Sequence, residues 1–239
     1  MKPLIIITGA SSGIGEACAR HFSDLGHSLL LVARRINRLN AMDLPNTLSR
    51  AVDVNDLKSF QGAVAEAEAE YGPCDALINN AGVMLLGQAD VPDPAEWKTM
   101  FDVNVLGLLN GIHLILAGMK ERGSGTVVNI SSIAGRKSFG NHAVYCGTKF
   151  AVHAITETIR EEVASSNVRF ITIAPGAVET ELLGHTTSQE IKDGYEAWKT
   201  DMGGVLSADD IARAVVFAHG QPQNVCIREI VIAATRQEP

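Results

Sequence analysis

Seven short runs rich in β-branched residues and leucine alternate along the chain with longer stretches of helical periodicity. The runs lie at residues 4–8, 28–33, 48–52, 76–79, 126–131, 170–174 and 227–232. They read as continuous apolar segments, which is typical of strands buried on both faces of a parallel sheet. Between them apolar residues recur three and four positions apart, as in the expected helix over residues 56–71. The alternation predicts βαβ units and a doubly wound parallel α/β sheet of about seven strands with helices on both faces.

One segment departs from this alternation without suggesting a second domain. Residues 177–206 follow the sixth run and surround a short amphipathic stretch at 189–199 with four glycines. An insertion beyond the carboxyl end of a strand is where a substrate lid would lie. Ser207 is the expected N-cap of a helix that runs through Phe217. No linker or repeat divides the chain, so we expect a single domain over residues 1–239 that contains this lid.

Composition and charge exclude several classes of protein. Apolar residues make up 46% and charged residues 20% of the 239 positions, which predicts a folded globular chain. The net charge of −7 provides no basic field for a nucleic-acid backbone. The four cysteines and seven histidines show no zinc-ligand spacing, so we expect no metal site.

Two stretches bear on localisation. Only four apolar residues precede Thr8 at the N-terminus, too few for a secretory signal. Residues 103–119 carry no charge but contain Asn104, Asn110, His113 and three glycines. These groups would be costly in lipid, whereas a helix buried in a soluble protein can place them at contacts. We therefore expect a cytoplasmic protein that does not bind a membrane.

A glycine-rich turn follows the first run and precedes a helical pattern that starts at Glu16. Bare backbone at the turn glycines would let a pyrophosphate approach the free N–H groups of the helix N-terminus. The spacing is G-x-x-x-G-x-G, and the alternative interpretation is a tight turn between strand and helix. The candidate cofactor-binding residues in this turn are Gly9, Ser11, Ser12, Gly13, Ile14 and Gly15.

The ends of the second and third runs indicate which dinucleotide binds. Arg34 and Arg35 follow the second run, where a carboxylate would bind the adenosine 2′-hydroxyl and repel a 2′-phosphate. Two guanidiniums suit a phosphate, so the sequence favours NADP over NAD, unless the arginines are only a solvated surface pair. After the third run, Asp53 and Val54 are candidates for the adenine site. Asp53 would accept a hydrogen bond from the adenine amino group, or it would cap the helix that begins near Asp56.

A third group of residues carries candidate chemistry. Tyr145 and Lys149 are four residues apart at the start of a long expected helix that continues to about residue 164. An ammonium about 4 Å from a phenol would stabilise the phenolate by an energy of order 4 kcal/mol, enough for a pKa decrease of about three units, of which desolvation would offset a part. An ordinary helical pair is the alternative. Ser132 ends the fifth run, where a hydroxyl can donate to a substrate oxygen.

Together these motifs resemble the short-chain dehydrogenase/reductase family over nearly the whole chain. The resemblance rests on the glycine-rich turn, Asp53, the segment 79–82, Asn104, Ser132, the Tyr145–Lys149 pair and the segment 175–180. It implies a Rossmann-type fold and an NADP-preferring branch of about this length. One departure is Ser12, where many NADP-preferring members carry a basic residue.

The resemblance also implies a role for each matching residue. Tyr145 would be the proton donor in reduction and the base in oxidation, Lys149 would bind the nicotinamide ribose, and Ser132 would hold the substrate carbonyl. Asn104 would position a water that relays protons to Lys149. The further cofactor-binding residues implied are Asn80, Ala81, Gly82, Pro175, Gly176, Val178 and Thr180. Val178 and Thr180 would contact the nicotinamide carboxamide.

The function that follows is an NADP(H)-dependent oxidoreductase that interconverts a secondary alcohol and a ketone or aldehyde by hydride transfer. A hydroxy acid is one candidate alcohol. The alternative is a non-catalytic NADP(H)-binding redox sensor or scaffold. The family also implies self-association to a dimer or homotetramer. Candidate substrate-pocket residues, each of which could instead serve packing or the surface, are Met84, Leu85, Arg136, Phe139, Asn141, His142, His185, Tyr195 and Trp198.

Overall fold

The computed structural model describes residues 2–238, and its centre is one seven-stranded sheet. All neighbouring strands pair in parallel, in the order β3-β2-β1-β4-β5-β6-β7. The strands are β1 Lys2–Thr8, β2 His27–Ala33, β3 Thr47–Ala51, β4 Cys74–Asn79, β5 Gly125–Ile130, β6 Val168–Pro175 and β7 Glu229–Ile232. Each coincides with one of the seven predicted runs, so the fold prediction is confirmed.

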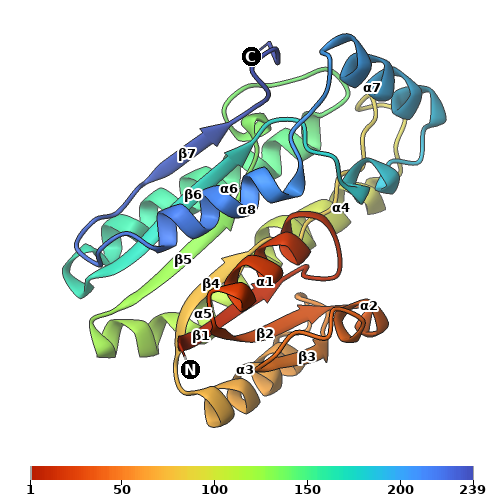
Figure 1. The fold of residues 1–239 in the computed structure, drawn as a ribbon. Helices are drawn as coiled ribbons and strands as arrows, with labels where there is room; N and C mark the ends of the chain where they lie inside the picture. The colour runs from red at the N-terminus through yellow and green to blue at the C-terminus, as the bar shows by residue number, and fades with distance from the viewer. Residues whose placement is uncertain (1, 239) are drawn as a thin grey trace.

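Helices cover both faces of the sheet (Figure 1). One layer contains α1 Gly13–Asp24, α2 Ile36–Asn40 and α8 Ala208–His219. The other contains α3 Leu57–Tyr71, α5 Gly107–Arg122 and α6 Ala143–Glu162. In the interior strand β1, Ile5 and Ile7 pack under the first layer, whereas Leu4 and Ile6 pack under the second. This double coverage explains why the strands read as continuous apolar runs instead of alternating ones.

Several helices begin where a side chain accepts a hydrogen bond from one of their first free N–H groups. Asp56 caps α3 by accepting a hydrogen bond from the Ser59 amide at 3.1 Å. Ser207 and Asp210 form a reciprocal capping box at the start of α8, as the predicted cap required. Helix α6 begins at Ala143, two residues before the predicted start at Tyr145.

The uncharged stretch forms the core-facing helix of the second layer. A helical segment Pro94–Arg122 is long and apolar enough to cross a membrane by length and composition alone, and 44% of its most apolar window is buried in the protein. It consists of α4 Pro94–Phe101, the π-helical turn η1 Asp102–Leu106, and α5. At Gly111 an added Cβ would lie 2.8 Å from Asn79 Oδ1, so α5 approaches the sheet too closely for a larger residue.

The predicted lid region forms two further helices beyond the end of β6, namely the 3₁₀ helix η4 Glu181–His185 and α7 Gln189–Asp201 (Figure 1). Leu182, Leu183, Ile191 and Tyr195 from these helices pack against a cluster that contains Tyr145. The buried Thr186 hydroxyl accepts a hydrogen bond from the Leu86 amide and donates one to the Met84 carbonyl, both at 3.2 Å. The region therefore lies over the carboxyl ends of the strands.

Candidate active site

A cleft of about 690 Å³ lies at the carboxyl ends of the strands, between the sheet and the η4–α7 region. Parallel α/β sheets bind ligands at this edge. Of the predicted catalytic and cofactor-binding residues, all but two line the cleft. The two exceptions are Gly15 and Asn104, which lie behind its wall.

The glycine-rich turn leads from β1 into helix α1, which begins at Gly13. Gly9 adopts a left-handed φ of 64°, and a Cβ there would lie 2.7 Å from the Ala81 Cα. At Gly15 an added Cβ would lie 2.5 Å from Asn80 Nδ2. Gly15 is thus required by packing against Asn80 and Gly9, and its predicted contact with the cofactor stays a prediction.

Asn80 and Thr8 hold this turn against the segment that follows β4. The Asn80 side-chain amide donates to the carbonyl oxygens of Thr8 at 3.1 Å and Gly9 at 3.2 Å. In return, the Thr8 hydroxyl accepts hydrogen bonds from the amides of Asn80 and Ala81, both at 3.0 Å. The two segments that are expected to bracket a cofactor are therefore fixed to one another through partly buried hydrogen bonds.

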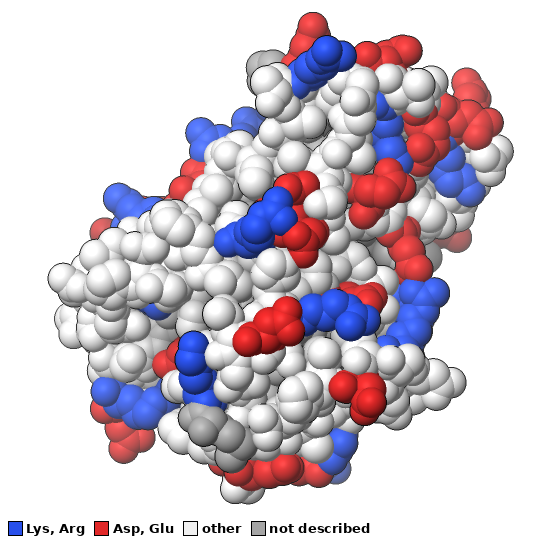
Figure 2. All heavy atoms as spheres, viewed as in Figure 1, with Lys and Arg blue, Asp and Glu red and all other residues white. Residues whose placement is uncertain are grey.

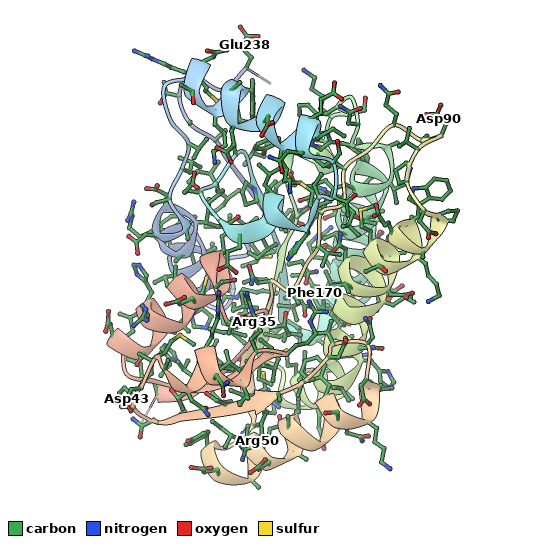
Figure 3. All side chains as sticks on the ribbon, turned by 90° about the vertical axis from the view of Figure 1, so that its right-hand side faces the viewer. Arg35, Asp43, Arg50, Asp90, Phe170 and Glu238 are labelled. Atoms are coloured by element: carbon green, nitrogen blue, oxygen red, sulfur yellow. The ribbon has the colours of Figure 1, made fainter. Side chains whose placement is uncertain are left out.

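The start of α1 fits a dinucleotide phosphate. Its N-cap residue, Ser12, is extended and makes no side-chain capping bond, so the first-turn N–H groups face the cleft without a side-chain acceptor. The Ser12 hydroxyl instead accepts a hydrogen bond from Arg35 Nη2 at 2.8 Å. Arg35 lies between the first helical layer and the lid region (Figure 3), and Arg34 lines the same part of the cleft.

Asp53 organises the turn after β3. Its carboxylate accepts a hydrogen bond from the Asn55 amide at 2.9 Å, and its side chain lines the cleft beside Val54. The cap of α3 is Asp56, so the capping alternative for Asp53 is wrong. A contact between Asp53 and adenine stays a prediction.

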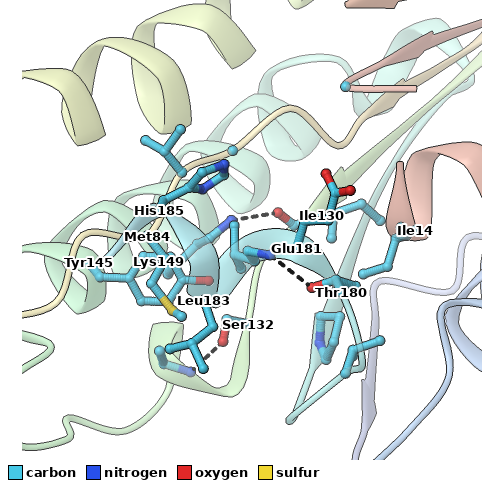
Figure 4. A pocket seen from close by; sticks show the side chains of 18 of the residues that line it. Ile14, Met84, Ile130, Ser132, Tyr145, Lys149, Thr180, Glu181, Leu183 and His185 are labelled. Atoms are coloured by element: carbon cyan, nitrogen blue, oxygen red, sulfur yellow. Dashed lines mark hydrogen bonds between the residues drawn. The ribbon is translucent and has the colours of Figure 1, made fainter. Parts of the chain in front are cut away.

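Ser132, Tyr145 and Lys149 converge on one wall of the cleft (Figure 4). Ser132 follows β5 and caps a short turn by accepting a hydrogen bond from the Ala134 amide at 3.1 Å. Tyr145 and Lys149 lie one turn apart in α6, and the Lys149 ammonium is 5.7 Å from the centre of the Tyr145 ring. Lys149 Nζ donates to the Ile130 carbonyl at 3.0 Å. The four-residue spacing of Tyr145 and Lys149 thus places both side chains in one site.

The protonation of this pair differs from the expectation. Burial raises the pKa of Tyr145 well above that of a free phenol, opposed in part by a hydrogen bond with Ser132. Burial also lowers the pKa of Lys149 to about 8. The predicted decrease in the phenol pKa is therefore wrong for the free protein, because desolvation of the buried phenol is the largest effect on its pKa. Tyr145 is protonated at neutral pH, as a proton donor must be.

Asn104 lies in the π-helical turn η1, almost fully buried. Its Oδ1 accepts from the Val83 amide at 2.8 Å, and its Nδ2 donates to the Val83 carbonyl at 2.9 Å and to the Thr148 hydroxyl at 3.1 Å. The side chain therefore joins the segment after β4 to α6, next to Lys149. Its predicted contact with a relay water stays a prediction.

The end of β6 supplies the other wall of the cleft. Pro175 ends this strand, and the Gly176 amide donates to the Ile232 carbonyl at 2.8 Å. Val178 forms an isolated bridge with Leu206 at the base of the lid region. Thr180 caps η4, and its methyl group would lie 3.1 Å from a Cβ on Gly13. The predicted nicotinamide segment and the glycine-rich turn thus face each other.

Comparisons with known proteins agree with this geometry. The sequence profile of the short chain dehydrogenase family matches residues 3–191. The chain belongs to this family. An uncharacterized oxidoreductase of Staphylococcus saprophyticus is 37% identical over 98% of this chain and 96% of its own length. Sulfoacetaldehyde reductase 2 of Chromohalobacter salexigens is 35% identical over 99% and 96% of the two chains. The closed form of a serine dehydrogenase complexed with NADP+ superposes with a TM-score of 0.91 at 30% identity, covering 99% and 96%.

Membership in the short-chain dehydrogenase family makes this chain an oxidoreductase with a nicotinamide dinucleotide cofactor. The glycine-rich turn, the uncapped start of α1 and the two arginines fit such a cofactor. The family fold and the oxidoreductase class are thus shown.

Aromatic rings form part of the cleft lining. Seven of the nine candidate substrate-pocket residues line the cleft, namely Met84, Phe139, Asn141, His142, His185, Tyr195 and Trp198. The His142 ring is 6.3 Å from that of Tyr145 and 6.5 Å from that of Tyr195, centre to centre. Leu85 and Arg136 are not part of the lining, and Arg136 pairs instead with Glu229 at 2.6 Å.

Two residues that line the cleft are not part of the sequence motifs. Gln237, near the C-terminus, accepts a hydrogen bond from the Ala177 amide at 2.9 Å through Oε1, and its Nε2 is buried without a partner among the described residues. Glu181, directly after Thr180, reaches across the cleft to Arg35. The sequence offers a signal only for Glu181, because it directly follows the matched segment 175–180.

The outer surface of this family member carries mixed charge. On the face shown in Figure 2, acidic and basic side chains are interspersed. Three exposed apolar residues, Phe101, Leu106 and Phe150, lie on the α4–η1 segment and on α6, whose residues pack together. Such exposed rings on neighbouring helices are candidates for contact with another copy of the chain.

Proposed function

We propose that the chain is an NADP(H)-dependent oxidoreductase that interconverts a secondary alcohol and a ketone or aldehyde, with Tyr145 as acid and base. A hydroxy acid is among the candidate alcohols. The observation that carries the proposal is the convergence of Ser132, Tyr145 and Lys149 on one wall of a cleft. The opposite wall of that cleft contains the residues expected to hold the cofactor.

The cofactor, when bound, supplies or accepts the hydride. The protein positions it through the start of α1 and through Arg34 and Arg35, which would hold a 2′-phosphate. Charge-assisted contacts of this kind support NADP over NAD. The complex of the serine dehydrogenase with NADP+ adds support from a protein of the same fold.

The proton chemistry belongs to the side chains. In reduction, the protonated Tyr145 hydroxyl would donate its proton to the carbonyl oxygen of the substrate, and Ser132 would hold that oxygen in place. In oxidation, the tyrosinate would take the proton back. Lys149 stabilises this anion when it is charged, and its hydrogen bond to Ile130 keeps the ammonium beside the ring.

Tyr145→Phe tests the proposal because it removes only the hydroxyl. We expect the rate of carbonyl reduction, followed by absorbance of the reduced nicotinamide over a panel of ketones, aldehydes and keto acids, to fall on the order of 10²-fold or more. The dissociation constant for NADPH, measured by calorimetry, should change by less than about threefold. Unchanged turnover would refute the role of Tyr145. Tight cofactor binding with no turnover of any substrate by the native chain would favour a redox sensor or scaffold.

We further propose that the chain assembles into a homotetramer or dimer. The exposed side chains of Phe101, Leu106 and Phe150 support this, because burying them against a second copy is favourable. Light scattering after size-exclusion chromatography tests it. Phe150→Glu should shift the mass toward the monomer, and a native chain that is monomeric at micromolar concentration would refute it.

A further inference from the structure

Glu181 forms an ionic bridge across the cofactor side of the cleft. Its Oε2 accepts from Arg35 Nη1 at 2.7 Å, and its Oε1 accepts from Arg38 Nη1 at 2.6 Å. Glu181 is the first residue of η4, whereas both arginines follow β2. A carboxylate from the lid region is thus held by two guanidiniums from the opposite wall of the cleft.

The bridge involves the same guanidinium that the NADP assignment requires. Arg35 Nε and Nη2 donate to the Ser11 hydroxyl at 3.1 and 3.0 Å, and Nη2 also donates to Ser12. These bonds fix the guanidinium against the glycine-rich turn and leave Nη1 directed at Glu181. A carboxylate and a phosphate are both recognised by the planar donor fork of arginine. Glu181 therefore uses a donor that a 2′-phosphate would need.

Glu181 is ionised, but its ion pairs with Arg35 and Arg38 contribute little net stability. Hydrogen bonds from Arg38 and Arg35 lower the pKa of Glu181 to about 2, so the carboxylate is an anion at physiological pH. The three side chains are between 46% and 50% exposed, and exposed ion pairs contribute little net stability. A phosphate with a charge near −2 would therefore compete well against a single carboxylate.

We propose that Glu181 is an internal anion that competes with the adenosine 2′-phosphate for Arg35 and Arg38, and so sets the affinity for NADP relative to NAD. The proposal rests on the proposed use of NADP(H). It assigns Arg38, which the sequence motifs do not single out, to the phosphate site. Glu181 should not affect the binding of a cofactor that lacks the 2′-phosphate, because such a cofactor does not compete with it for Arg35 and Arg38.

Glu181→Gln tests the competition by calorimetric titration of adenosine 2′,5′-bisphosphate and of adenosine 5′-monophosphate. These probes differ by the 2′-phosphate and need no turnover. We expect the variant to bind the bisphosphate about three- to tenfold more tightly than the native chain does, with binding of the monophosphate unchanged. Arg38→Met should weaken bisphosphate binding, and the gain from Glu181→Gln should be smaller when Arg38 is absent.

Glu179→Gln is the matched control. Glu179 lies two residues away on the same segment and is exposed, but it pairs with Lys199 at 2.8 Å and not with the arginines. If Glu179→Gln and Glu181→Gln have equal effects, general charge accounts for them and the competition is refuted. Weaker monophosphate binding in Glu181→Gln would also refute it, because Glu181 would then be a ribose ligand. If the native chain binds both probes equally well, the NADP assignment itself fails.

Discussion

The ammonium of Lys149 lies 5.7 Å from the centre of the Tyr145 ring, and burial shifts the two pKa values toward the neutral forms of both groups. The pKa of Lys149 falls to about 8, and that of Tyr145 rises. At neutral pH the site therefore contains a protonated phenol beside a charged amine. This is the protonation state that the proposed reduction of a carbonyl requires, since Tyr145 would be its proton donor.

The pH profile of reduction should report Lys149. The amine is charged below its pKa of about 8 and stabilises the tyrosinate that proton donation leaves behind. We expect kcat/KM for reduction to be level near pH 6–7 and to decline above about pH 8. Lys149→Arg keeps the charge at higher pH, so its decline should begin at least about one pH unit higher. A native profile that stays level beyond about pH 9.5 would contradict this.

Lys149 should also lower the stability of the fold. A lysine whose pKa is lower in the folded than in the unfolded state costs stability below the folded value, here about 8, and this cost disappears as the pH rises past the unfolded value of 10.5. We expect Lys149→Met to raise the free energy of unfolding by about 1–3 kcal/mol at pH 7 in urea titrations. The gain should shrink toward pH 10. Exposed Lys58→Met is the control and should change stability little; an equal gain there would contradict the prediction.

At Gly9 the effect on stability of the close approach of Ala81 can be separated from that of the left-handed conformation. Gly9 and Gly26 both have positive φ, but a Cβ at Gly9 would lie 2.7 Å from Ala81 Cα, whereas nothing lies within 4 Å of one at Gly26. We expect Gly26→Ala to destabilise by about 1–2 kcal/mol and Gly9→Ala by about 2–5 kcal/mol. Chemical unfolding measures both. Equal losses of stability in the two variants would show that the close approach of Ala81 adds no cost.

The strands and the catalytic spacing could be predicted because they depend on local pattern. Strands such as β1 are buried on both faces, so their composition alone identifies them. Tyr145 and Lys149 share a helix, so their separation of four residues fixes their relation. Ser132 required one further assumption, that the carboxyl ends of parallel strands meet at one edge.

The rest depends on contacts between segments that are distant in sequence. Glu181 binds Arg35 and Arg38 only because the chain beyond β6 folds back over β2. The pKa of Tyr145 could not be predicted from its spacing to Lys149, because its desolvation depends on burial against the lid region and the segment after β4. Gly15 likewise contacts Asn80, and no local pattern distinguishes it from the glycines that line the cleft.

Removal of Arg34 and Arg35 should show whether the cofactor carries a 2′-phosphate. In the double variant Arg34→Asp with Arg35→Ala, the 2′-phosphate loses its charge-assisted donors and meets a carboxylate. We expect the dissociation constant of NADPH to rise on the order of 10²-fold, and that of NADH by less than about threefold.

Arg20→Ala is a suitable control, because Arg20 is exposed and pairs with Glu16 on α1 outside the cleft lining. It should leave both constants unchanged. Raising the salt concentration should weaken NADPH binding to the native chain much more than binding to the double variant. Comparable losses of affinity for NADPH and NADH in the double variant would show that the arginines support the shape of the cleft and do not bind a phosphate.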